Sequence, residues 1–285
     1  MTHHPHLGGN FTIGGDLPVH RLGFGAMQIT GRGIWGEPRD VDGARELLRR
    51  VVESGVNLID TANSYGPEVS ERLIGETLHP YPDDVVIATK GGLLRPGPGN
   101  WQPHCTPEHL KKACEGSLQR LKVERIDLYQ LHTVDRKVPL EDSIGALKEL
   151  QDEGKIRHVG VSNFSVAEIE RARQIVDVVT VQNLYNLGDR SSEDVLEYCE
   201  REGIGFIPWY PLGSGDLLSS ERVSEVASMH RASPAQIALA WLLHKSPVML
   251  PIPGTASIDH FEENLGAGRI ELTAEEMSRI EKAGA

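Results

Sequence analysis

Hydrophobic and polar positions along the chain follow two patterns that alternate. Short runs rich in β-branched residues, such as residues 85–88, contain no polar position and are typical of strands buried on both faces of a parallel sheet. Most of these runs are separated by stretches in which apolar residues recur at helical spacing, as they do in residues 42–54. The alternation predicts a chain built from repeated strand–helix units.

Eight segments have strand character: residues 20–27, 57–62, 85–90, 126–132, 156–162, 178–183, 205–209 and 248–251. Eight strands that alternate with helices, at about 30 residues per unit, are the pattern of a (β/α)8 TIM barrel of the α/β class. A doubly wound open sheet is the alternative, since it gives a similar alternation with fewer strands. Residues 11–19, around Gly14 and Gly15, predict a β-hairpin, and we expect it to cap the bottom, N-terminal end of the barrel.

The starts of four helices are marked by capping residues. Each has a serine or threonine whose hydroxyl can accept a hydrogen bond from the first turn, followed by proline or, three residues later, by glutamate. These pairs are Thr106 with Pro107, Ser165 with Glu168, Ser233 with Pro234, and Thr273 with Glu276.

Two segments stand apart from the strand–helix alternation. Residues 91–105 are rich in glycine and proline and predict an ordered loop over the C-terminal face of the barrel. Residues 31–36 match the dinucleotide pattern GxGxxG but lack the strand before it and the helix after it, so we interpret them as a loop over the barrel mouth. No low-complexity linker or block of like charges divides the chain, so residues 1–285 are expected to form one barrel domain.

Composition and charge narrow the class of protein. The 285 residues are 39% hydrophobic and 25% charged, which is ordinary for a soluble globular domain. The formal net charge of -12 disfavours a nucleic-acid partner, because such proteins normally carry a basic surface. No apolar stretch approaches the roughly 18 residues of a membrane span, and the N-terminus lacks the pattern of a secretory signal.

The cysteine content and the absence of metal motifs indicate the compartment and the kind of chemistry. Cys105, Cys114 and Cys199 are too few and too scattered for a disulfide scaffold, and they suit free thiols in a reducing compartment. Neither HExxH nor a paired CxxC motif is present, so no metal site is predicted. These features predict a cytoplasmic enzyme with no membrane or nucleic-acid partner.

The candidate chemistry lies where predicted strands end, because this kind of barrel carries its reactive residues at the C-terminal ends of its strands. The second strand ends at Asp60, with Tyr65 shortly after it, the third at Lys90 and the fourth at His132. An ammonium group next to a tyrosine hydroxyl favours the phenolate and lowers a pKa that is ordinarily about 10. A carboxylate keeps the ammonium charged and in place, and a histidine N–H can hold a carbonyl oxygen on which negative charge develops.

These four residues together form a tuned proton donor, which suits the reduction of a carbonyl group with hydride from a nicotinamide cofactor. Each residue alone has a structural explanation. Asp60 could cap a turn, Lys90 could be a solvated side chain, and Tyr65 and His132 could be hydrogen-bonded packing residues. Their occurrence together at the strand ends of one barrel favours the catalytic interpretation.

The motifs at these strand ends belong to a wider pattern. The sequence resembles the aldo-keto reductase superfamily across nearly its whole length, in residues 57–66, 87–90, 127–132, 159–164, 181–186 and 252–265. The resemblance implies a (β/α)8 barrel with a catalytic tetrad of Asp60, Tyr65, Lys90 and His132. In that tetrad Tyr65 is the general acid in reduction and the general base in oxidation.

The same resemblance implies a cofactor site. Ser162, Asn163 and Gln182 correspond to residues that bind the nicotinamide carboxamide, and Trp209 to an aromatic residue, commonly tyrosine, that stacks on the ring. Further cofactor positions are Gly25, Ala26 and Met27 near the nicotinamide, Leu212, Gly213 and Ser214 along the pyrophosphate, Glu263 and Asn264 near the adenine, and Asp60, Tyr210, Pro253, Gly254, Thr255 and His260.

One departure from the family concerns the adenosine phosphate. Many members grip the 2′-phosphate of NADPH with a lysine and an arginine, and this sequence has Gly254 and His260 at those positions. Glycine carries no charge, and histidine is mostly neutral at pH 7. Thr255, Ser257 and backbone amides at the start of the following helix could still bind phosphate. NADP(H) is the expected cofactor, and NAD(H) is an alternative that these substitutions favour.

The implied activity is the reduction of an aldehyde or ketone to an alcohol by an enzyme that prefers NADP(H). Trp35 and Trp101 are candidate substrate residues, and with Met27 and Tyr210 they predict an apolar, partly aromatic pocket. Pyridoxal-type aldehydes are one candidate class, because some bacterial relatives reduce them. The alternatives are a cofactor-binding, redox-sensing subunit with slow turnover, and a lyase or metal-dependent hydrolase on an unrelated barrel. The family resemblance further implies a monomer.

Overall fold

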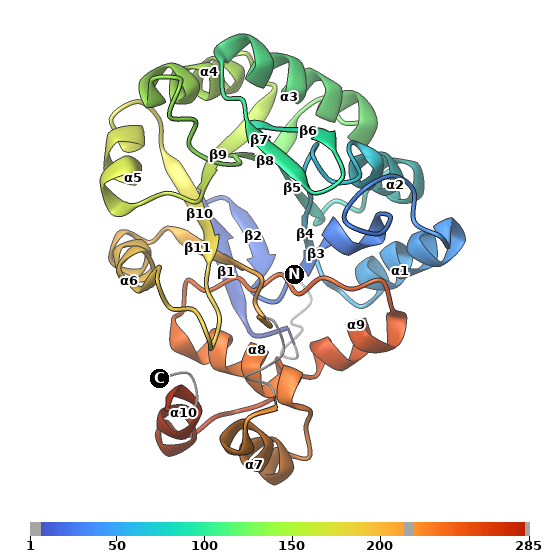
Figure 1. Ribbon diagram of the computed structural model, residues 1–285, viewed down its shortest axis with the longest axis vertical. Helices are drawn as coiled ribbons and strands as arrows, with labels where there is room; N and C mark the ends of the chain where they lie inside the picture. Colours follow the sequence, from blue (N-terminus) through green and yellow to red (C-terminus); the bar gives the residue numbers. More distant parts are fainter. Residues whose placement is uncertain (1–6, 214–218, 283–285) are drawn as a thin grey trace.

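The computed structural model describes residues 7–213 and 219–282, and Figure 1 views it down its shortest axis. Within these residues, seven strands form one sheet in which every neighbouring pair is parallel, in the order β11-β10-β9-β8-β5-β4-β3. They are β3 (Phe24–Gly25), β4 (Leu58–Asp60), β5 (Val86–Gly91), β8 (Ile126–Leu131), β9 (Ile156–Ser162), β10 (Val178–Leu184) and β11 (Gly205–Trp209). Each of them overlaps a strand predicted from the sequence.

The segment predicted as the eighth strand closes the sheet into a barrel without forming a regular strand. The Leu250 amide donates to the Phe206 carbonyl of β11 at 2.8 Å, and the Phe206 amide donates to the Val248 carbonyl at 2.8 Å. On the other side of the segment, the Gly23 amide donates to the Pro251 carbonyl at 2.9 Å, next to β3. Pro251 in this segment has no amide donor, so the ladder stays incomplete. The (β/α)8 barrel is confirmed, and the open-sheet alternative is wrong.

Helices cover the outside of the strands and form the outer ring in Figure 1. They are α1 (Val41–Glu53), α2 (Val69–Leu78), α3 (Pro107–Leu121), α4 (Leu140–Asp152), α5 (Val166–Arg173), α6 (Glu193–Glu202), α7 (Glu221–His230), α8 (Pro234–Lys245), α9 (Ile258–Leu265) and α10 (Ala274–Glu281). All four predicted caps are confirmed, because each hydroxyl accepts a hydrogen bond from an amide of the first turn of α3, α5, α8 or α10. None of the described helices is long and apolar enough to cross a membrane.

The predicted N-terminal hairpin is present and covers the bottom of the barrel. Strands β1 (Asn10–Ile13) and β2 (Leu17–His20) pair antiparallel. The hairpin residues Ile13, Leu17 and Val19 are buried in one cluster with residues of the barrel strands and the closing segment: Leu58, Val86, Ala88, Leu128, Ile207, Leu250 and Ile252. At the hairpin turn, the Asp16 carboxylate accepts a hydrogen bond from Arg157 at 2.9 Å, near the start of β9. This end of the barrel is therefore filled by the hairpin.

The first predicted strand, residues 20–27, is wrong in its extent. The hairpin strand β2 ends at His20, and β3 is only two residues long before the chain enters the 3-10 helix η1 (Ala26–Ile29). Between β2 and β3, the Arg21 guanidinium donates hydrogen bonds to the carbonyls of Gly8, Leu243, Ser246 and Met249. Arg21 therefore lies where the chain passes from the N-terminal hairpin to the barrel. The run predicted as one strand contributes residues to two different sheets.

The segment 91–105 is ordered, as predicted, but it is a hairpin rather than a loop. Strand β6 (Leu93–Gly97) pairs antiparallel with β7 (Asn100–Pro103), and Gly99 takes a φ of 70° in the turn. Its glycines and prolines serve the turn and the strand ends, which hid the pairing from the sequence pattern. The segment 31–36 is a loop, as predicted.

Candidate active site

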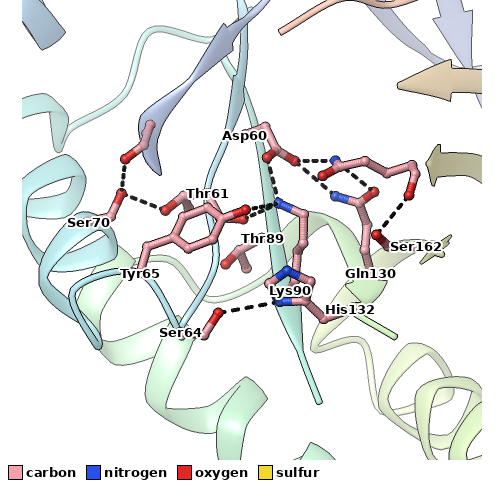
Figure 2. Close-up of polar contacts among 12 residues, drawn as sticks. Asp60, Thr61, Ser64, Tyr65, Ser70, Thr89, Lys90, Gln130, His132 and Ser162 are labelled. Carbon is pink, nitrogen blue, oxygen red and sulfur yellow. Dashed lines mark hydrogen bonds and ion pairs between the residues drawn. The ribbon is translucent and has the colours of Figure 1, made fainter. Parts of the chain in front are cut away.

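Lys90 lies at the centre of a buried network at the C-terminal ends of β4 and β5 (Figure 2). Its ammonium group donates to the Asp60 carboxylate at 2.5 Å, to the Thr61 carbonyl at 2.8 Å and to the Tyr65 hydroxyl at 3.4 Å. Lys90 is fully buried and Asp60 is 1% exposed, so water does not screen their charges. A buried ion pair needs its remaining polar atoms to be hydrogen-bonded as well.

The second carboxylate oxygen of Asp60 accepts two more hydrogen bonds inside the barrel. Nε2 of Gln130 lies 3.1 Å from Asp60 Oδ1, and Nε2 of Gln182 lies 2.8 Å from it. Sequence reasoning anticipated Gln182 but missed Gln130. The available signal was a polar residue within the apolar run of β8, two positions before His132 and so on the same side of the strand.

His132 follows β8 and lies beside Tyr65. The centroids of the two rings are 5.9 Å apart, with an angle of 81° between the ring planes. Nδ1 of His132 is 3.4 Å from the Ser64 hydroxyl oxygen, and Figure 2 shows both side chains near Lys90. The structure thus brings Asp60, Tyr65, Lys90 and His132 together, and we refer to these four residues as the tetrad.

Burial governs the protonation states of the tetrad. It raises the pKa of Tyr65 above its ordinary value, and this outweighs the opposing effect of the Lys90 charge. Lys90 lowers the Tyr65 pKa as expected, but burial has the larger effect, so the hydroxyl keeps its proton at neutral pH. Burial disfavours the charged form of Lys90, but Asp60 and Tyr65 outweigh it and hold the pKa of Lys90 above its ordinary value. Burial, together with the Lys90 charge, holds the pKa of His132 well below its usual range, so its imidazole is neutral.

A cavity of about 640 Å³ opens beside the tetrad. This volume is typical of a site for a small molecule or cofactor. Most of the residues singled out in the sequence line it: Gly25, Met27, Asp60, Tyr65, Trp101, His132, Ser162, Asn163, Gln182, Trp209, Tyr210, Leu212, Gly213, Pro253 and Gly254. Strand ends from around the whole barrel therefore share one cavity.

Amide and hydroxyl side chains on the wall opposite Tyr65 are fixed by hydrogen bonds. The Ser162 hydroxyl donates to the Gln182 carbonyl at 2.8 Å. The Asn163 amide donates to the His132 carbonyl at 3.1 Å, and its carbonyl oxygen accepts from the Trp209 indole N–H at 2.9 Å. Asn163 has a φ of 61°, a left-handed conformation that asparagine tolerates better than most residues and that is enriched at functional sites.

Some of the residues singled out in the sequence do not line the cavity: Ala26, Lys90, Trp35, Thr255, His260, Glu263 and Asn264. Lys90 and Ala26 are buried behind the wall. The ring centroid of Trp35 lies 5.6 Å from the Arg95 guanidinium carbon. The last four of these residues lie in or just before α9, close in sequence to Gly254. Ser214 lies outside the described residues.

Sequence reasoning missed part of the cavity wall, namely Gln28, Thr133, Pro211 and Ile252. Gln28, Thr133, Pro211 and Ile252 each lie next to a predicted site residue in the chain. Their position near the end of a strand was the available signal in the sequence. Leu93 and Trp101, which also line the cavity, belong to the segment that was expected to lie over this face of the barrel.

Two glycines bring backbone to the cavity surface where the closing segment meets β3. A Cβ on Gly254 would lie 2.6 Å from the Gly25 carbonyl oxygen, and a Cβ on Gly25 would lie 2.6 Å from the Ile252 carbonyl oxygen. Gly213, with a φ of 60°, adds a third stretch of bare backbone. Such surfaces let an anionic group approach backbone amides closely. The cavity wall thus has fixed amide side chains beside the tetrad and exposed glycine backbone at Gly213 and Gly254. This arrangement fits a nicotinamide dinucleotide.

Comparison with known proteins gives one consistent result. The model of the aldo/keto reductase family matches residues 21–285. An uncharacterised oxidoreductase of Schizosaccharomyces pombe is 50% identical over 271 residues, which cover 95% of this chain and 88% of that protein. Pyridoxine 4-dehydrogenase of Escherichia coli is 40% identical over 277 residues, which cover 95% of this chain and 96% of that protein.

The structural comparison agrees with the sequence comparison. The crystal structure of an aldo-keto reductase from Klebsiella pneumoniae in complex with NADPH superimposes with a TM-score of 0.83 at 28% sequence identity. The match covers 96% of this chain and 94% of that chain. The similarity therefore extends over the barrel and the cavity at its C-terminal end.

Proposed function

The chain belongs to the aldo/keto reductase family, and we propose that it is an NADP(H)-dependent oxidoreductase that converts an aldehyde or ketone to an alcohol. The observation that carries the proposal is the buried contact of Lys90 with both Asp60 and Tyr65 at the wall of a ligand-sized cavity. Proton donors of this kind contribute about 10²- to 10⁴-fold to a reaction rate.

In the proposed reaction, a reduced nicotinamide supplies hydride to the carbonyl carbon. Tyr65 donates the proton from its hydroxyl to the carbonyl oxygen, since its raised pKa keeps it protonated until the reaction. Lys90 stabilises the phenolate that Tyr65 becomes, and Asp60 holds Lys90 in place. His132, being neutral, can donate one ring N–H to the substrate oxygen as negative charge develops there.

The proposed cofactor site uses the fixed polar groups of the wall. Ser162, Asn163 and Gln182 would hold the carboxamide of the nicotinamide, and Trp209 would pack on its ring. The backbone at Gly213 and Gly254 would contact the phosphates. We propose NADP(H) as the preferred cofactor because the relative from Klebsiella was crystallised with NADPH.

We propose an uncharged, aromatic aldehyde or ketone as the substrate class. Leu93, Trp101, Tyr210 and Met27 give the cavity wall an apolar and aromatic character, and Asp60, the acidic side chain in it, is already paired with Lys90. The relative from Escherichia coli is a pyridoxine 4-dehydrogenase, so pyridoxal is one candidate within this class. The close packing of the tetrad argues against the regulatory subunit with slow turnover.

The proposal is tested by the initial rate at which the purified protein oxidises NADPH in the presence of 4-nitrobenzaldehyde or pyridoxal. We expect turnover with at least one of these aldehydes, and a lower rate when NADH replaces NADPH. The product should be identified as the alcohol, in a 1:1 ratio to the oxidised cofactor. No turnover of any aldehyde with either cofactor, by a protein that binds NADPH, would overturn the proposal.

A further inference from the structure

Arg95, in β6, is buried where the sequence pattern would place an exposed side chain. It is 8% exposed, whereas its neighbour Leu94 is 39% exposed. A short surface hairpin would be expected to turn the leucine inward and the arginine outward, because a charged group loses hydration on burial. Burying the Arg95 guanidinium in this hairpin therefore costs hydration free energy.

The buried charge of Arg95 has no carboxylate partner among residues 7–213 and 219–282. Its guanidinium donates to the Ser64 carbonyl at 3.1 Å and to the Gly33 carbonyl at 3.4 Å, and its buried Nε has no hydrogen-bond partner there. A buried arginine that only stabilised the fold would normally be paired with an acidic side chain. The missing partner indicates that the position of this group matters more than its contribution to stability.

The Arg95 guanidinium contacts two indole rings. Its guanidinium carbon lies 3.6 Å from the centroid of the Trp101 ring and 5.6 Å from the centroid of the Trp35 ring. A planar guanidinium can stack on an aromatic face while its edge donates hydrogen bonds, which neither lysine nor methionine can do. Arg95 thus fastens the loop 31–36 and the β6–β7 hairpin to Ser64.

Through Trp101, the contacts of Arg95 extend to Tyr65 at the cavity wall. The Trp101 ring, which lines the cavity, meets the Tyr65 ring edge-on, with centroids 6.4 Å apart and an angle of 79°. Ser64 precedes Tyr65 in the chain, and its hydroxyl lies 3.4 Å from Nδ1 of His132 (Figure 2). Because Ser64 is also held by its contact with His132, loss of the Arg95 guanidinium would mainly displace the Trp101 ring of the cavity wall.

We infer that Arg95 is a positioning residue that, anchored to the Ser64 carbonyl, holds the Trp101 ring and makes this site selective for aromatic over small aliphatic carbonyl substrates. The inference rests on the proposed function. An aromatic substrate packs against the Trp101 ring and depends on its orientation. An aldehyde of two or three carbons can reach Tyr65 without touching that ring.

The test compares 4-nitrobenzaldehyde with propanal in the wild type, in Arg95→Met and in Arg95→Lys. We expect both variants to lower kcat/KM for the aromatic aldehyde by about tenfold to a hundredfold, mainly through KM, because small displacements near a reacting group have effects of this size. Values for propanal should change less than about threefold, and the Kd for NADPH should stay constant. Arg32→Met, which removes an exposed arginine from the neighbouring loop, is the matched control and should behave as wild type.

Trp101→Leu keeps the test decisive if a variant of Arg95 fails to fold. It should show the same selective loss, and adding Arg95→Met to it should cause little further loss of selectivity, because two residues that act through one contact are not additive. Equal losses for both aldehydes, a weaker Kd for NADPH, or full rescue by Arg95→Lys would overturn the inference. Absence of wild-type turnover would instead overturn the proposed function.

Discussion

At the scale of single residues, burial decides what the tetrad can do. Tyr65 and His132 are 7% and 8% exposed, and burial shifts their pKa values in opposite directions, upward for the hydroxyl and downward for the imidazole. Both shifts favour the neutral form. In the account given above, the site meets its substrate with a neutral proton donor, a neutral hydrogen-bond donor and one ammonium group between them.

These shifts predict the pH dependence of reduction. The ordinary pKa values are 6.5 for histidine and 10.0 for tyrosine. The pKa of His132 lies well below 6.5 and the pKa of Tyr65 lies above 10.0. Both groups therefore keep their neutral forms near neutral pH. We expect kcat/KM for carbonyl reduction to be constant between about pH 7 and pH 9 when measured with saturating NADPH. A tenfold fall between about pH 7 and pH 9 would contradict these assignments.

The choice of cofactor gives a second prediction at this scale. His260 is exposed in the first turn of α9, where the family commonly has an arginine on the adenosine 2′-phosphate. We expect His260→Arg to lower the Kd for NADPH by about tenfold and to leave the Kd for NADH nearly unchanged, since a hydrogen bond to a charged group contributes roughly 1.5–3 kcal/mol. Fluorescence titration measures both constants. Gln119→Arg adds the same charge on α3, and a similar gain there would show that net charge, not the position, is responsible.

Residues were predictable from the sequence where polar side chains lie at the C-terminal ends of apolar strands, as Asp60, Lys90 and His132 do. Gln130 and Arg95 were not, because each lies within a strand and its partners come from other elements. The effect of Lys90 on the Tyr65 pKa was predictable, but the larger, opposing effect of burial was not. The sequence shows that Lys90 lies at the end of a neighbouring strand, but it does not show how completely the hydroxyl is shielded from water.

At the scale of elements, the barrel closes through an unusually close backbone contact. The closing segment and β3 approach so nearly that both Gly25 and Gly254 leave no room for a Cβ. Lysine has a Cβ as well, so the residue that the family commonly has at position 254 would not fit this backbone.

Gly254→Ala is predicted to destabilise the protein. Its Cβ would lie 2.6 Å from the Gly25 carbonyl oxygen, and overpacking that forces backbone to move costs about 1–3 kcal/mol. Urea unfolding measures the change in the free energy of unfolding. Gly145→Ala, inside α4 with open space around its Cβ, is the control and should stabilise the helix slightly. An unchanged stability of Gly254→Ala would mean that the two segments are further apart than described.

Helices and strands were predictable from the sequence where each residue pattern belongs to a single element. The helices with serine or threonine caps begin where expected, because a cap is set by local hydrogen bonds. The first barrel strand was predicted too long, since its apolar run is shared between the N-terminal hairpin and the barrel. The β6–β7 hairpin was missed because its pairing depends on the turn at Gly99 more than on alternating side chains.

At the scale of the whole molecule, the two ends of the barrel have separate tasks. The β1–β2 hairpin fills the N-terminal end with apolar side chains, whereas the cavity and the tetrad occupy the C-terminal end. Barrels of this kind commonly separate stability and chemistry in this way. Changes at the hairpin should therefore alter the free energy of unfolding and leave the chemistry intact.

Ile13→Ala tests this separation. Ile13 is fully buried between the hairpin and the barrel interior, and truncating such a residue costs about 2–5 kcal/mol. We expect that loss in urea unfolding, with kcat and KM close to wild type at a temperature where the variant stays folded. Met229→Ala, which truncates a side chain that is 64% exposed, should change little. A loss of activity without a loss of stability would contradict the assignment of stability to the N-terminal end of the barrel and of catalysis to the C-terminal end.

The central claim is that Tyr65 donates the proton during carbonyl reduction, and a single-turnover measurement of Tyr65→Phe tests it most directly. The account predicts that hydride transfer from NADPH to an aromatic aldehyde slows by about 10²- to 10⁴-fold, while the Kd for NADPH stays nearly constant. Tyr81→Phe, which removes a hydroxyl that donates to the Leu121 carbonyl away from the cavity, should react at the wild-type rate. A Tyr65→Phe enzyme that transfers hydride within about threefold of wild type would contradict the claim.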